Sequence, residues 1–165
     1  MAKAGVLTGY DDGTARPNAN ATRAEFVTFI MKLMKAESNA EVDFNDINTS
    51  AWYMKYLSAA VDKGWVKGRT DGSFAPNDSI TREEAFTIIS RVIDSLGVTA
   101  TVDTSVLDAF KDKDSISEWA KNDTAKLVEL GIIEGSEGKL KPKAEITRAE
   151  ICIILDRVME KYLNK

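Results

Sequence analysis

Apolar residues recur at helical spacing in three separate stretches of the chain. In each stretch they occupy positions i, i+3, i+4, i+7 and i+8, which lie along one face of an α-helix. The three sets are Phe26, Phe29, Ile30, Leu33 and Met34; Ala85, Ile88, Ile89, Val92 and Ile93; and Ile151, Ile154, Leu155, Val158 and Met159. The pattern predicts three amphipathic helices, each with one apolar face to bury.

Each predicted helix begins with the motif Thr-Arg-x-Glu, which has the form of a capping box. In a capping box the threonine oxygen accepts a hydrogen bond from the glutamate amide, and the glutamate side chain accepts one from the threonine amide. The pairs are Thr22 and Glu25, Thr81 and Glu84, and Thr147 and Glu150. Helix initiation alone therefore explains the threonine and the glutamate.

The motif arginine needs a separate explanation. Arg23, Arg82 and Arg148 occupy the first helical position, where a cation opposes the helix dipole at a cost of about 0.3–1 kcal/mol. One explanation is that the arginines and the free amides of the helix starts face a common anion. The other is that each arginine pairs with an acidic side chain across a repeat boundary. The residues by themselves leave both explanations open.

Glycine and proline positions indicate that the helices belong to longer tandem repeats. A glycine-rich turn precedes each motif, and the third turn is one residue shorter than the other two. The glycines are Gly5, Gly9 and Gly13; Gly64, Gly68 and Gly72; and Gly131, Gly135 and Gly138. Pro17, Pro76 and Pro142 each lie five residues before a motif threonine.

A complete unit also has a leading helix before its glycine turn. In the second unit this helix is predicted over 51–63, with Ser50 as its N-cap and Gly64 in the left-handed position that ends it. The first unit begins where such a helix would be ending. It lacks the Phe-x-Asp that precedes this helix elsewhere and the tryptophan that the helix carries, which is Trp52 in the second unit and Trp119 in the third. The predicted domains are a partial unit at 4–36 and complete units at 44–96 and 110–163, joined by polar connectors at 36–43 and 97–109.

The composition argues against several classes of function. A net charge of −4 is unfavourable for nucleic-acid binding, which needs a basic surface. The chain has no histidine, the commonest general base and metal ligand. Its one cysteine, Cys152, aligns with Val27 and Phe86, so we expect a core residue. No apolar run has transmembrane length, and membrane insertion is not expected.

Metal, cofactor and catalytic sites are also not expected. The glycine turns lack the oxygen ligands of an EF-hand and the sequence context of a phosphate-binding loop. No serine or cysteine nucleophile has a recognisable base beside it. Asp46 or Asp112 could form a glycosidase pair with a motif glutamate, but the capping box already explains that glutamate. We therefore expect a protein that is not an enzyme.

The order of Phe-x-Asp, tryptophan, glycine-rich turn and Thr-Arg-x-Glu resembles the S-layer homology domain family. The resemblance implies a mainly α fold, with three repeats in a pseudo-threefold bundle of which the first lacks its leading half. It also implies an extracellular role at the bacterial cell surface, attaching proteins to cell-wall polysaccharide. The implied ligand is a secondary cell wall polymer that bears a pyruvate ketal, which is a carboxylate.

The same resemblance implies binding grooves between neighbouring repeats. Arg23 would act with Trp52, and Arg82 with Trp119, because a guanidinium holds a carboxylate and an indole face packs on a sugar ring. The alternative for both tryptophans is a place in the core. The further candidates are Asp46 and Asp112, which accept sugar hydroxyls or cap the turn before their helices, and Arg69, which adds specificity in one groove.

The incomplete first unit leads to two further expectations. Arg148 has no tryptophan-bearing first unit to act with, so that groove is defective or is completed by another chain or an upstream segment. The stripe of Phe26, Phe29, Ile30 and Leu33 would be less shielded than its counterparts, which favours self-association. The alternative function is a structural or protein-interaction module of a surface layer that binds no glycan.

Overall fold

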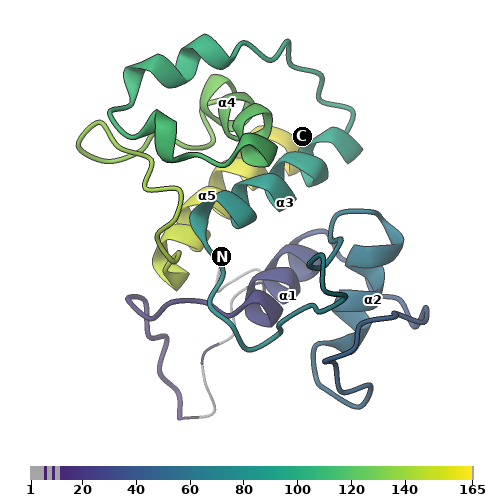
Figure 1. Ribbon diagram of the computed structural model, residues 1–165. Coiled ribbons are helices and arrows are strands. Elements are labelled where there is room, and N and C mark those ends of the chain that lie inside the picture. The colour runs from purple at the N-terminus through teal and green to yellow at the C-terminus, as the bar shows by residue number, and fades with distance from the viewer. Residues whose placement is uncertain (1–5, 7–8, 10–11, 165) are drawn as a thin grey trace. The chain divides into compact units, whose positions relative to one another are not determined.

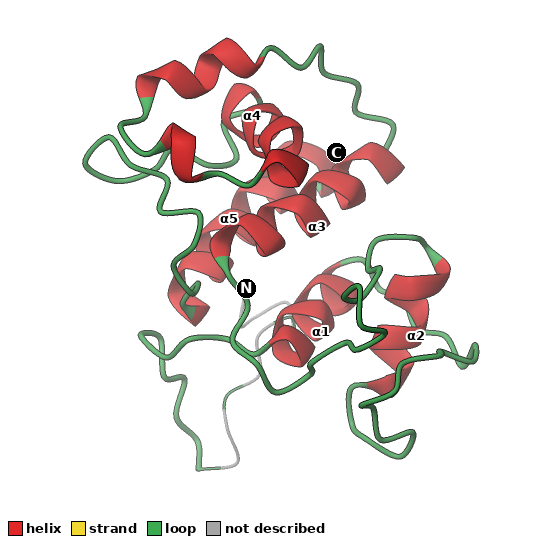
Figure 2. Cartoon of the chain, in the orientation of Figure 1, coloured by secondary structure: helices red, strands yellow, loops and turns green. Residues whose placement is uncertain are grey.

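The computed structural model describes residues 6, 9 and 12–164. Within these residues the secondary structure is helical, and β-pairing is confined to isolated bridges (Figure 2). The mainly α fold class is thereby confirmed. The chain divides into two compact units, Met1–Ile80 with Thr147–Asp156 and Thr81–Ile146 with Arg157–Lys165. Each unit is described by itself.

The first unit is built on helix α1 (Arg23–Leu33), which packs against helix α2 (Met54–Asp62) (Figure 1). It also holds most of helix α5 (Arg148–Val158). The capping box of α1 forms as predicted. The Glu25 amide donates to Thr22 Oγ1 at 3.2 Å, and the Thr22 amide donates to Glu25 Oε2 at 2.9 Å. Helix α2 begins later than predicted, because Ser50 donates its amide to Asn48 in a turn and does not cap the helix.

The second unit is built on helix α3 (Arg82–Ser95), which packs against helix α4 (Lys121–Glu129). Short 3₁₀ helices surround this pair: η2 (Thr104–Ala109), η3 (Lys113–Ser115) and η4 (Glu118–Ala120). A π-helical turn, η5 (Met159–Leu163), follows α5. Helix η2 packs on α4 and buries Leu107, so the connector at 97–109 contributes to the core and is not merely a polar link.

Backbone pairing connects the three motif starts in cyclic order. Each motif threonine forms an antiparallel bridge with the residue two positions before another motif threonine: Thr22 with Ser79, Thr81 with Glu145, and Thr147 with Asn20. The first repeat therefore pairs with the second, the second with the third, and the third with the first. Each of these pairings lies within one of the two units. The first repeat thus supplies, at Asn20, the strand-like segment with which the third motif pairs.

Most of the apolar stripe of α1 is well covered, contrary to the expectation from the sequence. Phe26, Phe29 and Ile30 are each exposed by 3% or less, whereas Leu33 is only partly buried and its counterparts Val92 and Val158 are buried. For the first three residues the expectation was wrong, because α1 is covered by α2, which comes from the second repeat. The predicted place of Cys152 in the core also needs correction, because the cysteine is only partly buried.

Candidate functional site

The three motif arginines hold the glycine-rich loops of neighbouring repeats. Each donates its Nε–H to a backbone carbonyl and lies with its guanidinium over an aromatic ring. The carbonyls belong to Phe74 for Arg23 (2.7 Å), Leu140 for Arg82 (2.7 Å) and Ala15 for Arg148 (3.1 Å). The rings belong to Phe74, Phe86 and Phe29 respectively, at 5.1–5.3 Å. Each arginine is thus part of a junction between two repeats.

The arginines differ in burial. Arg23 and Arg148 are buried, whereas Arg82 is only half-buried. Arg148 Nη1 pairs with Glu25 Oε1 of the first repeat at 3.0 Å. For Arg148, pairing with an acid across a repeat boundary is therefore confirmed.

The backbone amides at the helix starts already have acceptors. The Arg23, Arg82 and Arg148 amides donate to the carbonyls of Asp78, Ala144 and Ala19, and the next amide of each helix donates to Pro76, Pro142 or Pro17. The third amide donates to the motif threonine. The prediction that free amides help to bind an anion is wrong. A ligand carboxylate near the motif would have to be bound by the guanidinium group.

The aspartate of Phe-x-Asp holds the same loop as the arginine. Asp46 accepts the Phe74 amide at 2.8 Å and the Ala75 amide at 2.7 Å, one on each carboxylate oxygen. Asp112 accepts the Leu140 and Lys141 amides in the same way, at 2.9 and 2.7 Å. Neither aspartate caps the turn before its own helix, which corrects one of the two alternatives. A contact with sugar hydroxyls stays a prediction for both.

The two candidate tryptophans lie on the surface. Trp52 is 61% exposed and Trp119 is 57% exposed, so their proposed place in the core is wrong. Trp52 precedes α2 and contacts the Tyr53 ring edge-on, with centroids 5.5 Å apart. Trp119 lies in η4, directly before α4. Both indoles therefore stand at the start of a leading helix. Helix α2 packs on α1, which begins at Arg23, and η4 packs on α3, which begins at Arg82. The pairing of each tryptophan with the arginine stays a prediction.

The loop that carries Arg69 is ordered by its own side chains. Arg69 pairs with Asp78 at 2.9 Å, and both side chains are exposed. The Ser73 hydroxyl and amide donate to Asp71 and hold the pKa of that carboxyl below its usual range. The expectation that Arg69 adds ligand specificity stays a prediction.

The second junction contains a polar cluster that sequence reasoning missed. Glu83 is buried and accepts hydrogen bonds from the Ser117 amide and hydroxyl at 3.0 Å and from Lys143 Nζ at 2.6 Å. The signal was the motif itself, which has Glu83 where the other copies have Ala24 and Ala149. Because Ser117 directly precedes η4, the cluster fixes the segment that carries Trp119.

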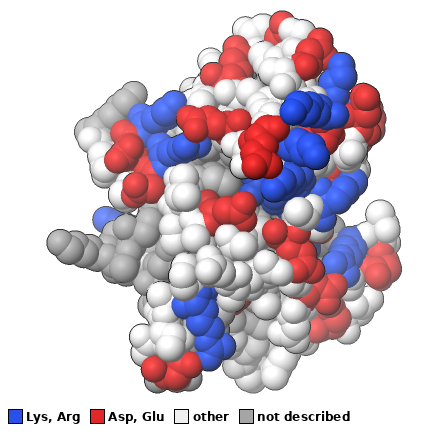
Figure 3. All heavy atoms as spheres, turned by 90° about the vertical axis from the view of Figure 1, so that its left-hand side faces the viewer, with Lys and Arg blue, Asp and Glu red and all other residues white. Residues whose placement is uncertain are grey.

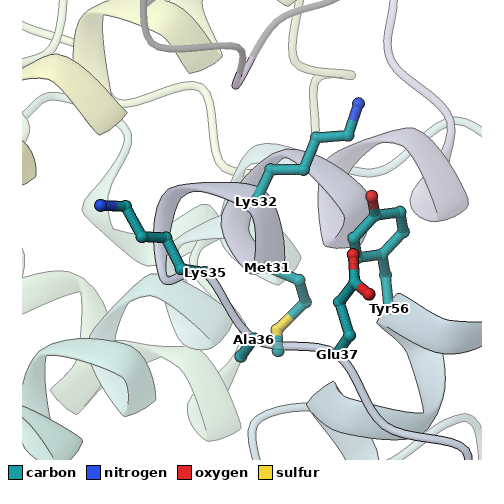
Figure 4. A pocket seen from close by; sticks show the side chains of 6 residues that line it. All are labelled: Met31, Lys32, Lys35, Ala36, Glu37 and Tyr56. Atoms are coloured by element: carbon teal, nitrogen blue, oxygen red, sulfur yellow. The ribbon is translucent and has the colours of Figure 1, made fainter.

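Two surface hollows in the first unit lie apart from these residues. One, of about 380 Å³, lies at the end of α1 and is lined by Met31, Lys32, Lys35, Ala36, Glu37 and Tyr56 (Figure 4). The Glu37 carboxylate in this hollow forms an ion pair with Lys55, with Nζ and Oε1 2.8 Å apart. The other lies between residues 38–43 and the first turns of α2. None of the candidate site residues lines either hollow.

The distribution of charged and metal-ligating side chains indicates no further candidate site among the described residues. On the face shown in Figure 3, acidic and basic side chains lie among one another. In the part of the chain that the structure describes, no group of three His, Cys, Asp or Glu residues is placed to hold a metal ion. Over the same residues, no helix has the length and apolar character needed to cross a membrane.

Comparisons with known proteins agree with the architecture of these repeats. The family model of the S-layer homology domain matches residues 1–27, 43–86 and 109–152. The chain is 36% identical to an exoglucanase, XynX, of Acetivibrio thermocellus, over 99% of this chain and 15% of that protein. It is 33% identical to a surface-layer 125 kDa protein of Lysinibacillus sphaericus, over 97% of this chain and 13% of that protein.

A third relative is named for its anchoring role. The cellulosome-anchoring protein of Acetivibrio thermocellus is 31% identical over 94% of this chain and 35% of that protein. The chain thus spans a minor part of each of these relatives, and the family itself is non-catalytic even where a relative is an enzyme. The chain belongs to the S-layer homology domain family and is an extracellular module for anchoring at the bacterial cell surface.

Proposed function

We propose that this module anchors its protein by binding an anionic, pyruvylated secondary cell wall polysaccharide in grooves at the junctions between repeats. The observation that carries the proposal is the pair of exposed tryptophans, Trp52 and Trp119, at equivalent positions of two junctions. An indole has a large apolar face and a polar N–H, and tryptophan is enriched where proteins bind other molecules. A sugar ring is a suitable partner for an indole face.

The arginines of the two junctions supply the complementary charge. A guanidinium group binds a carboxylate with charge-assisted hydrogen bonds, and partial burial strengthens that attraction. Arg82 is half-buried and is therefore more accessible to a ligand than the buried Arg23. On this basis the Arg82 and Trp119 groove is expected to be the stronger of the two.

The indole contact has a substantial expected energy. Covering about 100 Å² of apolar surface contributes about 2.5 kcal/mol. Loss of both tryptophans should therefore abolish most of the binding. Neither side chain is buried in the fold, so the same change should leave stability almost unaltered.

The test is binding of the Trp52→Ala, Trp119→Ala double variant to purified cell walls. We expect at least about a 30-fold loss of affinity, by the energy above, and an equal loss when wild-type protein meets walls stripped of ketal pyruvate. Val102→Ala, which also removes an exposed apolar side chain, is the matched control. Unchanged binding to stripped walls would favour the alternative, a structural or protein-interaction module that uses no pyruvylated glycan.

A further inference from the structure

An exposed lysine is held in a fixed position at the second junction. Lys143 Nζ donates to Glu83 Oε1 at 2.6 Å and also to the Ser117 hydroxyl. The Glu83 side chain is 5% exposed, whereas the Lys143 side chain is 57% exposed. Fixing a lysine removes much of its rotamer freedom. Because the protein has already fixed this side chain, Lys143 is a preorganised donor for any ligand that reaches it.

The backbone of Lys143 lies directly against the start of α3. The carbonyls of its two neighbours in the chain accept the amides of Glu83 and Arg82, at 3.0 and 2.9 Å. Its ammonium contacts Ser117, which lies two residues before the exposed Trp119. Lys143 therefore contacts both of the segments that carry the proposed groove residues of this junction.

The Lys143 ammonium has a further donor beyond those used in this cluster. An ammonium group carries three N–H donors. Among the described residues, the structure gives it two acceptors, the Glu83 carboxylate and the Ser117 hydroxyl. The exposure of the side chain leaves the third donor to solvent. Because Glu83 compensates the charge of Lys143, the pair attracts an anion only weakly, and its third donor suits an uncharged oxygen such as a sugar hydroxyl.

The first junction has the same backbone without this cluster. There the amides of Arg23 and Ala24 donate to the two carbonyls that flank Asn77, which is therefore the counterpart of Lys143. Asn77 is exposed, and Ala24 offers no carboxylate to hold a cation. The corresponding serine, Ser50, is also exposed and donates its amide within its own turn. The two junctions therefore present different donors to a ligand.

We propose that Lys143 is a ligand-binding residue of the second groove, where its third N–H donates to an uncharged oxygen of the glycan, and that Glu83 is the residue that positions it. The inference rests on the proposed function and refines it. Arg82 meets the carboxylate of the ligand, and Lys143 meets a hydroxyl oxygen of the same glycan. The first groove lacks this contact, so the two sites of one chain differ in affinity.

The test gives the second junction the residues of the first. The double change Glu83→Ala, Lys143→Asn does this and should preserve the fold, because the first junction folds with the same residues. It is made in a Trp52→Ala chain, so that under the proposed function the second groove alone binds purified cell walls. We expect the affinity to fall about three- to tenfold, the value of one net hydrogen bond. The salt dependence should stay the same, because the removed pair carries no net charge.

The single change Glu83→Ala in the same background separates positioning from support of the fold. It keeps Lys143 but removes both its partner and the compensating charge. The affinity should fall at high salt, because the lysine is no longer held, and should rise more steeply as salt is lowered, because an uncompensated cation attracts the anionic glycan. A residue that only supported the fold would leave the salt dependence unchanged. Glu118→Ala, which removes an equal charge from η4 and an exposed pair with Lys121, is the matched control.

Three results would overturn the proposal. Wall binding by the doubly changed chain that is as tight as that of its parent would show that Lys143 makes no ligand contact. A lower affinity with a weaker salt dependence would show that Lys143 meets an anionic group. Equal steepening in Glu118→Ala and Glu83→Ala would assign the effect to net charge alone. Failure of the proposed function is a different result, in which Trp119→Ala leaves the wall binding of the Trp52→Ala chain unchanged, and the role of Lys143 would fall with it.

Discussion

The three motif arginines make the same kind of contact with a backbone carbonyl and a ring, but they differ in burial. Arg82 has a half-buried guanidinium that donates to Leu140 and lies over Phe86. Arg148 is buried against Glu25, whose side chain is 16% exposed. The low exposure of both members makes the Arg148 and Glu25 pair costly to break.

The ion pair of Arg148 should contribute more to stability than an exposed ion pair. Arg148→Ala should lower the free energy of unfolding by about 3–5 kcal/mol, because it breaks a largely buried ion pair with Glu25. Lys121→Ala, which removes the exposed pair with Glu118, should lower it by at most about 1 kcal/mol. Urea denaturation of both variants gives the comparison. Equal losses would mean that the Arg148 and Glu25 pair contributes no more than a surface pair.

Residue patterns predicted the motif helices well and the arginines only in part. Apolar periodicity and the capping box depend only on residues a few positions apart. They therefore predicted α1 and α3 correctly, with Thr22 and Thr81 as the N-caps. The partners of Arg82 and Arg148 lie 58 and 133 residues away along the chain. Local sequence rules carry no information on contacts of that separation.

At the scale of elements, the Phe-x-Asp segment of a repeat packs against the glycine turn of the same repeat and is hydrogen-bonded to it. Asp46 accepts the Phe74 and Ala75 amides, and the Phe44 ring stacks on Phe74 at 5.7 Å. A Cβ placed on Gly68 would lie 2.3 Å from the Phe44 ring. The turn needs glycine for its positive φ and also for the close approach of this ring.

Alanine at Gly68 should therefore be more damaging than alanine at another positive-φ glycine. Gly68→Ala should cost about 1–3 kcal/mol more than Gly97→Ala, because overpacking is added to the backbone strain. Gly97 has φ 75°, and a Cβ placed on it would meet nothing within 4 Å, so its substitution isolates the backbone cost. Thermal or urea unfolding measures both. Similar losses would show that Phe44 moves aside without penalty.

The leading helices are the elements that sequence reasoning described least well. Ser50 has the residue type of an N-cap, but Asn48 accepts its amide, and α2 starts at Met54. Trp119 was expected within a leading helix but lies in η4, which the Glu83, Ser117 and Lys143 cluster fixes. In both cases a polar contact that competes with helix initiation decided the local structure.

At the scale of the whole molecule, the backbone bridges recur at all three motifs, whereas the exposed tryptophans occur in two repeats. The bridges between motif starts give every motif the same kind of backbone partner, including the third, which pairs with the first repeat. The exposed tryptophans precede the leading helices of the second and third repeats. Each motif therefore has a backbone partner, whereas two of them have an exposed indole in the repeat that follows.

This asymmetry sets the expected stoichiometry of ligand binding. The two exposed indoles, Trp52 and Trp119, belong to the proposed junctions of Arg23 and Arg82, so we expect two grooves per chain. Calorimetry with a short pyruvylated ligand should give two sites per chain, and Trp119→Ala should reduce the number to one. Because the ligand is anionic and the contact includes an ion pair, both affinities should fall as salt rises. Three equal sites, or two sites that survive loss of Trp119, would show that the indoles do not define the grooves.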